Sequence, residues 1–142
     1  MRKSVLLAFL LAALASLARA QQATPLATGN FTGIAHKTTG KAIVLGTADG
    51  GHVLRLENFR TSNGPDVRVY LVKGGNGTNS DFIKAGGDNF VDLGPLKGNI
   101  GDQNYTIPAN VNLDEYKSVS IWCRRFAVNY GGTNLEPTGT NR

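Results

Sequence analysis

The chain has 142 residues, of which 15 are Lys or Arg and 10 are Asp or Glu. Three of the basic residues fall within the first twenty positions, so the remaining 12 basic residues nearly balance the 10 acidic ones and do not indicate a nucleic-acid partner. The 18 glycines, about twice the usual density, favour turns over long helices, and the length suits a single domain.

The first twenty residues have the features of an export signal. Basic residues at positions 2 and 3 precede an apolar run over 5–15, and Ala18-Arg19-Ala20 has the small-x-small form that signal peptidase accepts. The run is too short to cross a bilayer, and no later apolar segment is long enough. We therefore expect residues 1–20 to be a cleaved signal peptide, the protein to be exported to the periplasm or the extracellular space without a membrane span, and residues 21–28 to form a flexible lead-in.

From residue 29 onwards, short segments of alternating apolar and polar residues are separated by turn residues, as an antiparallel all-β domain requires. Asp49-Gly50 and Gly64-Pro65 supply backbone conformations of tight turns. We predict a single antiparallel β-sandwich, jelly-roll-like or Greek-key-like, over residues 29–135, and a disordered tail over 136–142. About eight strands are expected, at 29–36, 41–47, 52–59, 66–73, 90–93, 105–109, 116–124 and 126–130.

Two further features of the pattern concern the surface of this sandwich. The segments 52–59 and 66–73 alternate with period two, which predicts one packed face and one solvent-exposed face for each sheet. The only helix is expected at 114–117. The segment 74–89 is long and rich in Gly, Asn and Asp, which is typical of a mobile surface loop or of a place where a ligand binds.

Cys123 is the only cysteine, and exported proteins usually carry cysteines in pairs. If 116–124 is a strand, Val119, Ile121 and Cys123 share its apolar face. The alternation changes parity after Cys123, so a bend or bulge is predicted at Arg124-Arg125, where two guanidinium groups would favour the thiolate. Four roles stay open for the thiol: a small core residue, a redox or adduct-forming group, a haem or metal ligand, or a partner in an intermolecular disulfide.

Other kinds of site are less well supported. His36 and His52 lie at predicted strand ends without a recognisable nucleophile, so no catalytic residue and no metal site is assigned, and we do not expect an enzyme. Trp122, Tyr70 and Tyr130 are candidates for ligand binding, because aromatic rings stack on sugars. The position of Trp122 beside two serines is equally consistent with packing under a loop.

A set of short motifs runs through residues 29–128: Gly29-Asn30-Phe31, Leu54-Arg55-Leu56-Glu57-Asn58-Phe59, Gly64-Pro65-Asp66, Val69-Tyr70-Leu71, Leu93-Gly94, Gln103-Asn104-Tyr105 and Trp122-Cys123. In these motifs the chain resembles the DM-thirteen family, a module of secreted proteins that is often described as an electron-transfer domain and found beside DOMON domains. The resemblance implies an all-β fold and a characteristic cysteine, matched by Cys123, that acts as a free thiol or holds a prosthetic group such as haem.

The functional expectation follows from this resemblance more than from the residues themselves. It is an electron-transfer or redox module centred on Cys123, with Trp122, Arg124 and Arg125 as its surroundings. The alternative is a non-catalytic β-sandwich that binds polysaccharide or another component of the cell envelope. The sequence identifies neither the redox partner nor a required cofactor, and a monomer is expected.

Overall fold

The structure is a computed structural model that describes residues 23–139. Its elements are β1 (Thr24–Asn30), β2 (Thr32–Gly33), β3 (Thr39–Gly46), β4 (His52–Arg60), β5 (Val67–Lys73), α2 (Ser80–Lys84), β6 (Phe90–Pro95), β7 (Gln103–Ile107), β8 (Tyr116–Cys123), β9 (Val128–Asn134) and β10 (Glu136–Pro137). No helix within residues 23–139 is long and apolar enough to span a bilayer.

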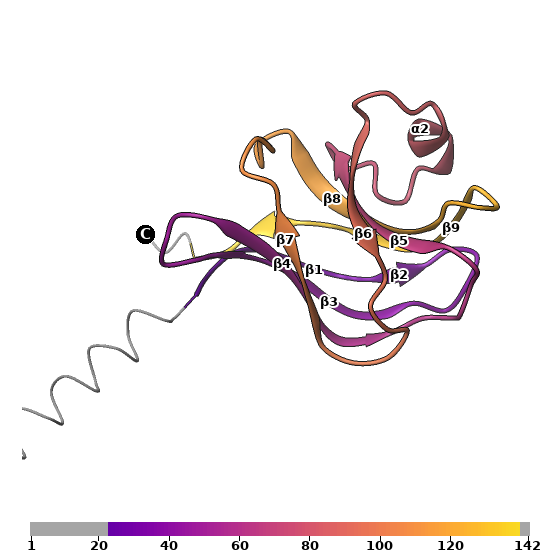
Figure 1. Cartoon of the computed structure of the whole chain (residues 1–142), viewed down its shortest axis with the longest axis horizontal. Coiled ribbons are helices and arrows are strands. Elements are labelled where there is room, and N and C mark those ends of the chain that lie inside the picture. The colour runs from indigo at the N-terminus through magenta and orange to yellow at the C-terminus, as the bar shows by residue number, and fades with distance from the viewer. Residues whose placement is uncertain (1–22, 140–142) are drawn as a thin grey trace, which may run out of the picture.

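The strands form two five-stranded antiparallel sheets that face each other in an unclosed sandwich (Figure 1). One sheet has the order β10-β1-β3-β4-β7 and the other the order β2-β9-β8-β5-β6. The predicted all-β sandwich is therefore confirmed. The turn predicted at Asp49-Gly50 joins β3 to β4, where Gly50 has a φ of 85° and the Thr47 amide donates to the Gly51 carbonyl at 2.9 Å.

The period-two alternation correctly selects the core. Leu54 and Leu56 of β4 are fully buried between the sheets, whereas Arg55 and Glu57 form an ion pair on the outer face. The second sheet departs from the expected single wet face, because Tyr70 and Val72 on the outer side of β5 are also buried. Something covers this face of the second sheet.

The segment 74–89 covers this face. It was predicted to be a mobile loop or a ligand-binding segment, but it packs against the outer side of the second sheet. The Asn79 side chain accepts a hydrogen bond from the Phe82 amide at 3.1 Å and begins the short helix α2. Ile83 on that helix is buried in a second apolar cluster together with Tyr70, Val72 and Trp122. The segment therefore closes the outer face of the second sheet.

The helix expected at 114–117 is wrong. The amides of Glu115 and Tyr116 donate to the Asn112 carbonyl at 3.0 and 3.1 Å, and this makes a single turn that is not continued. Tyr116 already belongs to β8, where it pairs with Lys73 of β5. Pairing with a neighbouring strand overrides the local preference for a helix.

The two ends of the described chain are more ordered than the sequence suggested. β1 begins at Thr24, inside the expected lead-in, because its backbone pairs with β3. Glu136–Pro137, at the start of the expected tail, pairs with Ala27 and Thr28 of β1. The expected signal peptide and the last three residues of the tail lie outside the described residues.

The chain crosses from one sheet to the other at two buried residues. Phe31 separates β1 from β2, so the predicted continuous strand over 29–36 is broken there. Leu135 separates β9 from β10 in the same way. Both side chains pack in the main core, and the two crossings are neighbours, because β1 pairs with β10 and β2 pairs with β9.

Candidate functional site

Cys123 is the last residue of β8 and lies opposite Val67 of β5 and Val128 of β9. Its side chain is on the inner face of the sheet with Val119 and Ile121, as the parity of the strand predicts, and its exposed fraction is 0%. The thiol is therefore part of the sandwich core and out of contact with solvent.

Trp122 points to the opposite face of the sheet, under α2. Its ring stacks on that of Tyr70 with centroids 6.2 Å apart, and Tyr70 stacks on Phe90 at 4.1 Å. Trp122 is only 4% exposed, and Tyr130 lies in the main core on the other side of the sheet. The three rings do not form the exposed stacking surface that the sequence suggested, and Trp122 packs beneath the 74–89 segment instead.

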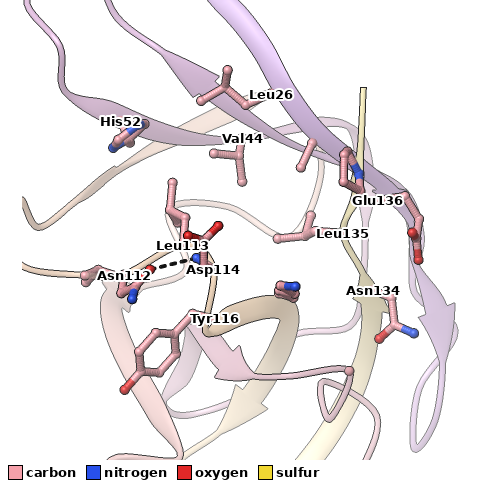
Figure 2. A pocket seen from close by; sticks show the side chains of 15 residues that line it. Leu26, Val44, His52, Asn112, Leu113, Asp114, Tyr116, Asn134, Leu135 and Glu136 are labelled. Atoms are coloured by element: carbon pink, nitrogen blue, oxygen red, sulfur yellow. Dashed lines mark hydrogen bonds between the residues drawn. The ribbon is translucent and has the colours of Figure 1, made fainter. Parts of the chain in front are cut away.

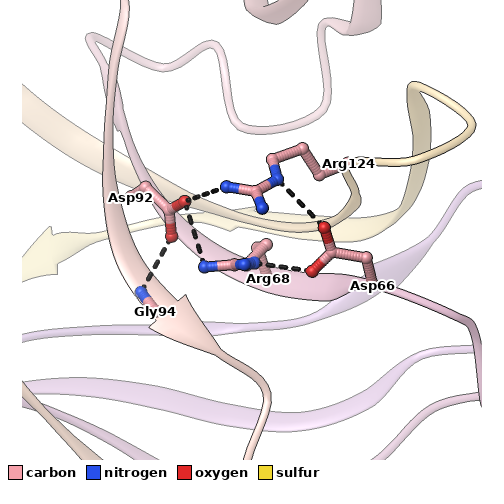
Figure 3. A network of polar contacts seen from close by, with 5 residues as sticks. All are labelled: Asp66, Arg68, Asp92, Gly94 and Arg124. Atoms are coloured by element: carbon pink, nitrogen blue, oxygen red, sulfur yellow. Dashed lines mark hydrogen bonds and ion pairs between the residues drawn. The ribbon is translucent and has the colours of Figure 1, made fainter.

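Arg124, the residue after Cys123, is directed away from the thiol and joins an ion-pair network with Arg68. Arg124 Nε lies 2.9 Å from one oxygen of Asp66, and Arg68 Nε lies 2.7 Å from the other (Figure 3). Both guanidinium groups also approach Asp92, at 3.8 and 3.6 Å. The hydrogen bond from Arg68 is the largest cause that lowers the pKa of Asp66.

This network changes the expected role of the basic pair. The Arg124 charge is balanced by two carboxylates on the outer face, and the Arg125 guanidinium lies 5.8 Å from the centre of the Phe126 ring. Neither cation is available to stabilise a thiolate at Cys123, so the activation predicted from the sequence is not supported.

The neighbour that the sequence missed is Tyr130. The chain turns between β8 and β9 at residues 124–127, and the predicted bulge lies a little further into the sheet. Ile121 pairs with Gly131 and Trp122 pairs with Asn129, which leaves Tyr130 as the extra residue of a β-bulge. A bulge re-aims the side chain of its extra residue, and here the phenol enters the core beside Cys123.

The Tyr130 hydroxyl has a defined partner. It donates to the Asn63 carbonyl at 3.0 Å, and the next residue, Gly64, passes so close that a Cβ there would lie 2.3 Å from the phenol oxygen. Burial raises the pKa of Tyr130, and the neighbouring Cys123 raises it further. The phenol is therefore held in its neutral, proton-carrying form over the ordinary pH range.

Two surface features lie next to this pair. The exposed His36 packs its ring on Tyr130 with centroids 4.1 Å apart and an interplanar angle of 54°. On another side, Asn63 and Gly64 form part of the wall of a shallow hollow of about 360 Å³ between residues 62–67 and 95–99. The sequence placed His36 at a strand end but gave no sign of its contact with Tyr130.

The prosthetic group that the resemblance implies does not fit around Cys123. The sulfur is enclosed by core side chains, so a planar group the size of haem would have to displace them. Within residues 23–139, no three His, Cys, Asp or Glu side chains cluster in a way that could hold a metal ion. The local donor set is one thiol and one phenol, which are redox-active side chains in their own right.

Comparison with known proteins identifies the family of the chain. The family model described as Electron transfer DM13 matches residues 30–135, which is 106 of the 142 residues. No curated protein and no solved structure gives a match. The matched range begins at the last residue of β1 and ends at Leu135, so it includes β2 to β9, Cys123 and Tyr130 but not β10 or most of β1. The chain therefore belongs to the electron transfer DM13 family.

Proposed function

We propose that this protein transfers single electrons and that its redox group is the buried pair of Cys123 and Tyr130. The observation that carries the proposal is the bulge in β9, which brings a phenol against the only thiol of the chain. Membership of a family described by electron transfer supports the same class of function.

The burial of the pair favours one-electron chemistry over thiol chemistry. A thiolate attack needs solvent access and a nearby cation, and Cys123 has neither. Electrons pass through a few ångströms of packed protein without solvent contact. The exposed ring of His36, tilted against the ring of Tyr130 with centroids 4.1 Å apart, offers a route from the pair to the surface.

The proposed step balances as follows for a one-electron oxidant outside the protein. Tyr130 gives one electron to the oxidant by way of His36 and releases the proton of its hydroxyl, which forms a neutral phenoxyl radical. The proton leaves past the Asn63 carbonyl to water in the adjacent hollow. One electron from a donor and one proton from water restore the phenol, and Cys123 shares the unpaired electron by exchanging a hydrogen atom with Tyr130.

The remaining parts of the functional proposal concern the surroundings of the protein. We propose that the partners are separate one-electron carriers that dock over His36. We also propose that the protein works outside the cytoplasm, on the basis of the basic, apolar and small-residue pattern of positions 1–20.

The test is oxidation of the purified chain by hexachloroiridate(IV), with the electrons per chain and the rate followed by stopped-flow absorbance. The wild type should give up one electron per chain in a fast phase that Tyr130→Phe abolishes and Cys123→Ala alters. Tyr105→Phe is the matched control, because Tyr105 is also a buried core tyrosine whose hydroxyl is hydrogen-bonded, but it is not next to the thiol. A fast phase that survives Tyr130→Phe would overturn the proposal.

A further inference from the structure

A second feature lies at the end of the sandwich opposite Cys123. A pocket of about 660 Å³ opens between the two sheets, with Tyr116 in its wall (Figure 2). Tyr116 and Cys123 are the first and last residues of β8, so the pocket and the thiol are separated by the length of that strand, about 24 Å. The pocket therefore takes no part in the proposed redox step.

The inner wall of the pocket is apolar. Val44 of β3 and Leu135 at the sheet crossing are core residues, and Leu113 extends towards them from the loop between β7 and β8 (Figure 2). The Asn112 side chain accepts from the Asp114 amide at 2.9 Å and so fixes the turn that carries Leu113. The wall is thus supported by ordered backbone.

The roof of the pocket is set by a second bulge. Pro25 pairs with Leu45 and Ala27 pairs with Val44, which leaves Leu26 as the extra residue in β1. Its side chain lies over the pocket and is 40% exposed (Figure 2).

Polar groups of both charges gather at the mouth. Asp114 and Glu136 are acidic, Lys117 is basic, and His52 and Asn134 offer further hydrogen-bonding groups. The two carboxylates outnumber the one ammonium, so the rim disfavours an anionic ligand, while its donors and acceptors can bond a neutral group of either kind. It suits a neutral polar end on a molecule whose body is apolar.

We propose that this pocket binds a small neutral molecule with an apolar body and a hydrogen-bonding end. Its volume falls within the range of ligand pockets, and an apolar wall with a few polar groups is their usual lining. The site is concave and enclosed by three separate segments, β1, the 111–114 loop and the β9–β10 crossing, which fits a small molecule better than the face of another protein.

The test uses the full chain and the neutral fluorescent probe N-phenyl-1-naphthylamine, whose emission rises in apolar sites. The wild type should show a saturable binding phase that Leu26→Asn weakens about tenfold, because one leucine contact is lost. Ile34→Asn is the matched control, since Ile34 is 44% exposed and does not line the pocket. Leu113→Asn should weaken binding to a similar degree.

Three outcomes would overturn the proposal. One is probe binding that is the same in the wild type, Leu26→Asn and Leu113→Asn. Another is saturable probe binding that appears only when residues 1–20 are removed, because the chain's own N-terminal segment would then occupy the pocket. The third is a dimer, seen by light scattering, that Leu26→Asn dissociates, because the occupant would then be a second copy.

Discussion

The two ends of the sandwich each contain a β-bulge, but one end is filled and the other is open. At the filled end Phe31 packs edge-on against Phe59 at 5.3 Å, and the bulge places Tyr130 in the core. At the open end the bulge places Leu26 over a pocket of about 660 Å³, and Leu135 lies in the pocket wall.

The difference follows from side-chain volume. At the filled end the rings of Phe31, Phe59 and Tyr130 occupy the space between the sheets, whereas at the open end Leu26, Leu113 and Leu135 leave part of it empty. The filled end holds its thiol and phenol in fixed positions, which a redox pair needs. The open end has apolar walls that no residue between 23 and 139 covers fully, which a ligand site needs.

The difference in packing between the two ends can be measured by truncating one apolar side chain at each end. Phe59→Ala should lower the free energy of unfolding by about 3–5 kcal/mol, because it leaves a large cavity in a packed region. Leu113→Ala at the open end should cost about 1 kcal/mol, because that leucine is only partly buried. Urea denaturation of both variants gives the two values, and equal losses would show that the ends are equally packed.

The close packing of the Gly64 backbone against the Tyr130 hydroxyl can be tested by adding a methyl group at Gly64. Gly64→Ala should destabilise the protein by about 1–3 kcal/mol, since its Cβ would lie 2.3 Å from the Tyr130 hydroxyl and 2.7 Å from Val67. Gly98→Ala is the control, because its nearest contact would be an ordinary 3.6 Å. If thermal unfolding shows no difference between the two variants, the loop does not close over the phenol.

The exclusion of water from the Cys123 side chain can be tested by comparing the unfolding free energies of Cys123→Ser and Cys123→Ala. Cys123→Ser should cost about 1–3 kcal/mol because it buries a hydroxyl in an apolar environment. Cys123→Ala should cost about 1 kcal/mol, for the small cavity alone. Unfolding curves in urea give both values, and a serine variant more stable than the alanine variant would indicate that water or a polar partner reaches this position.

The smallest expected effect concerns the ion-pair network on the outer face of the closed end. The folded-state pKa of Asp66 is below its ordinary value of 3.8, so the carboxylate stabilises the fold above about pH 4, and this contribution is lost as the pH falls through the folded pKa. Asp66→Asn should therefore lower the melting temperature slightly at pH 7 and have less effect at pH 3. The control, Asp81→Asn, removes a carboxylate outside the network, and the same pH dependence in both variants would contradict the assignment.

The sequence was sufficient for those features that depend on local alternation. Parity alone placed Cys123 in the core and Trp122 on the other face, and the glycine-rich spacing gave the sandwich. It was insufficient where pairing between distant strands decides the outcome. The bulge that brings Tyr130 to Cys123 exists only in the register between β8 and β9, so no local pattern marks it.

The sheet crossing at Phe31 and the helix α2 were also not predicted, because contacts between distant segments decide both. Phe31 looks like part of a strand because it continues an apolar pattern, but it crosses between sheets to fill the end of the core. The helix α2 is too short to show a period, and only Asn79 followed by Asp81 in the first turn gives a signal for its start. The covering of Trp122 by this helix therefore could not be predicted, although packing under a loop was one of the alternatives.

Rapid-freeze electron paramagnetic resonance after one-electron oxidation of the native chain shows directly which residue carries the unpaired electron. We expect a tyrosyl signal in the wild type that is absent in Tyr130→Phe, has an altered line shape in Cys123→Ala, and is unchanged in Tyr105→Phe. A signal that persists in Tyr130→Phe, or that Tyr105→Phe removes instead, would contradict the assignment of the redox group to the closed end of the sandwich.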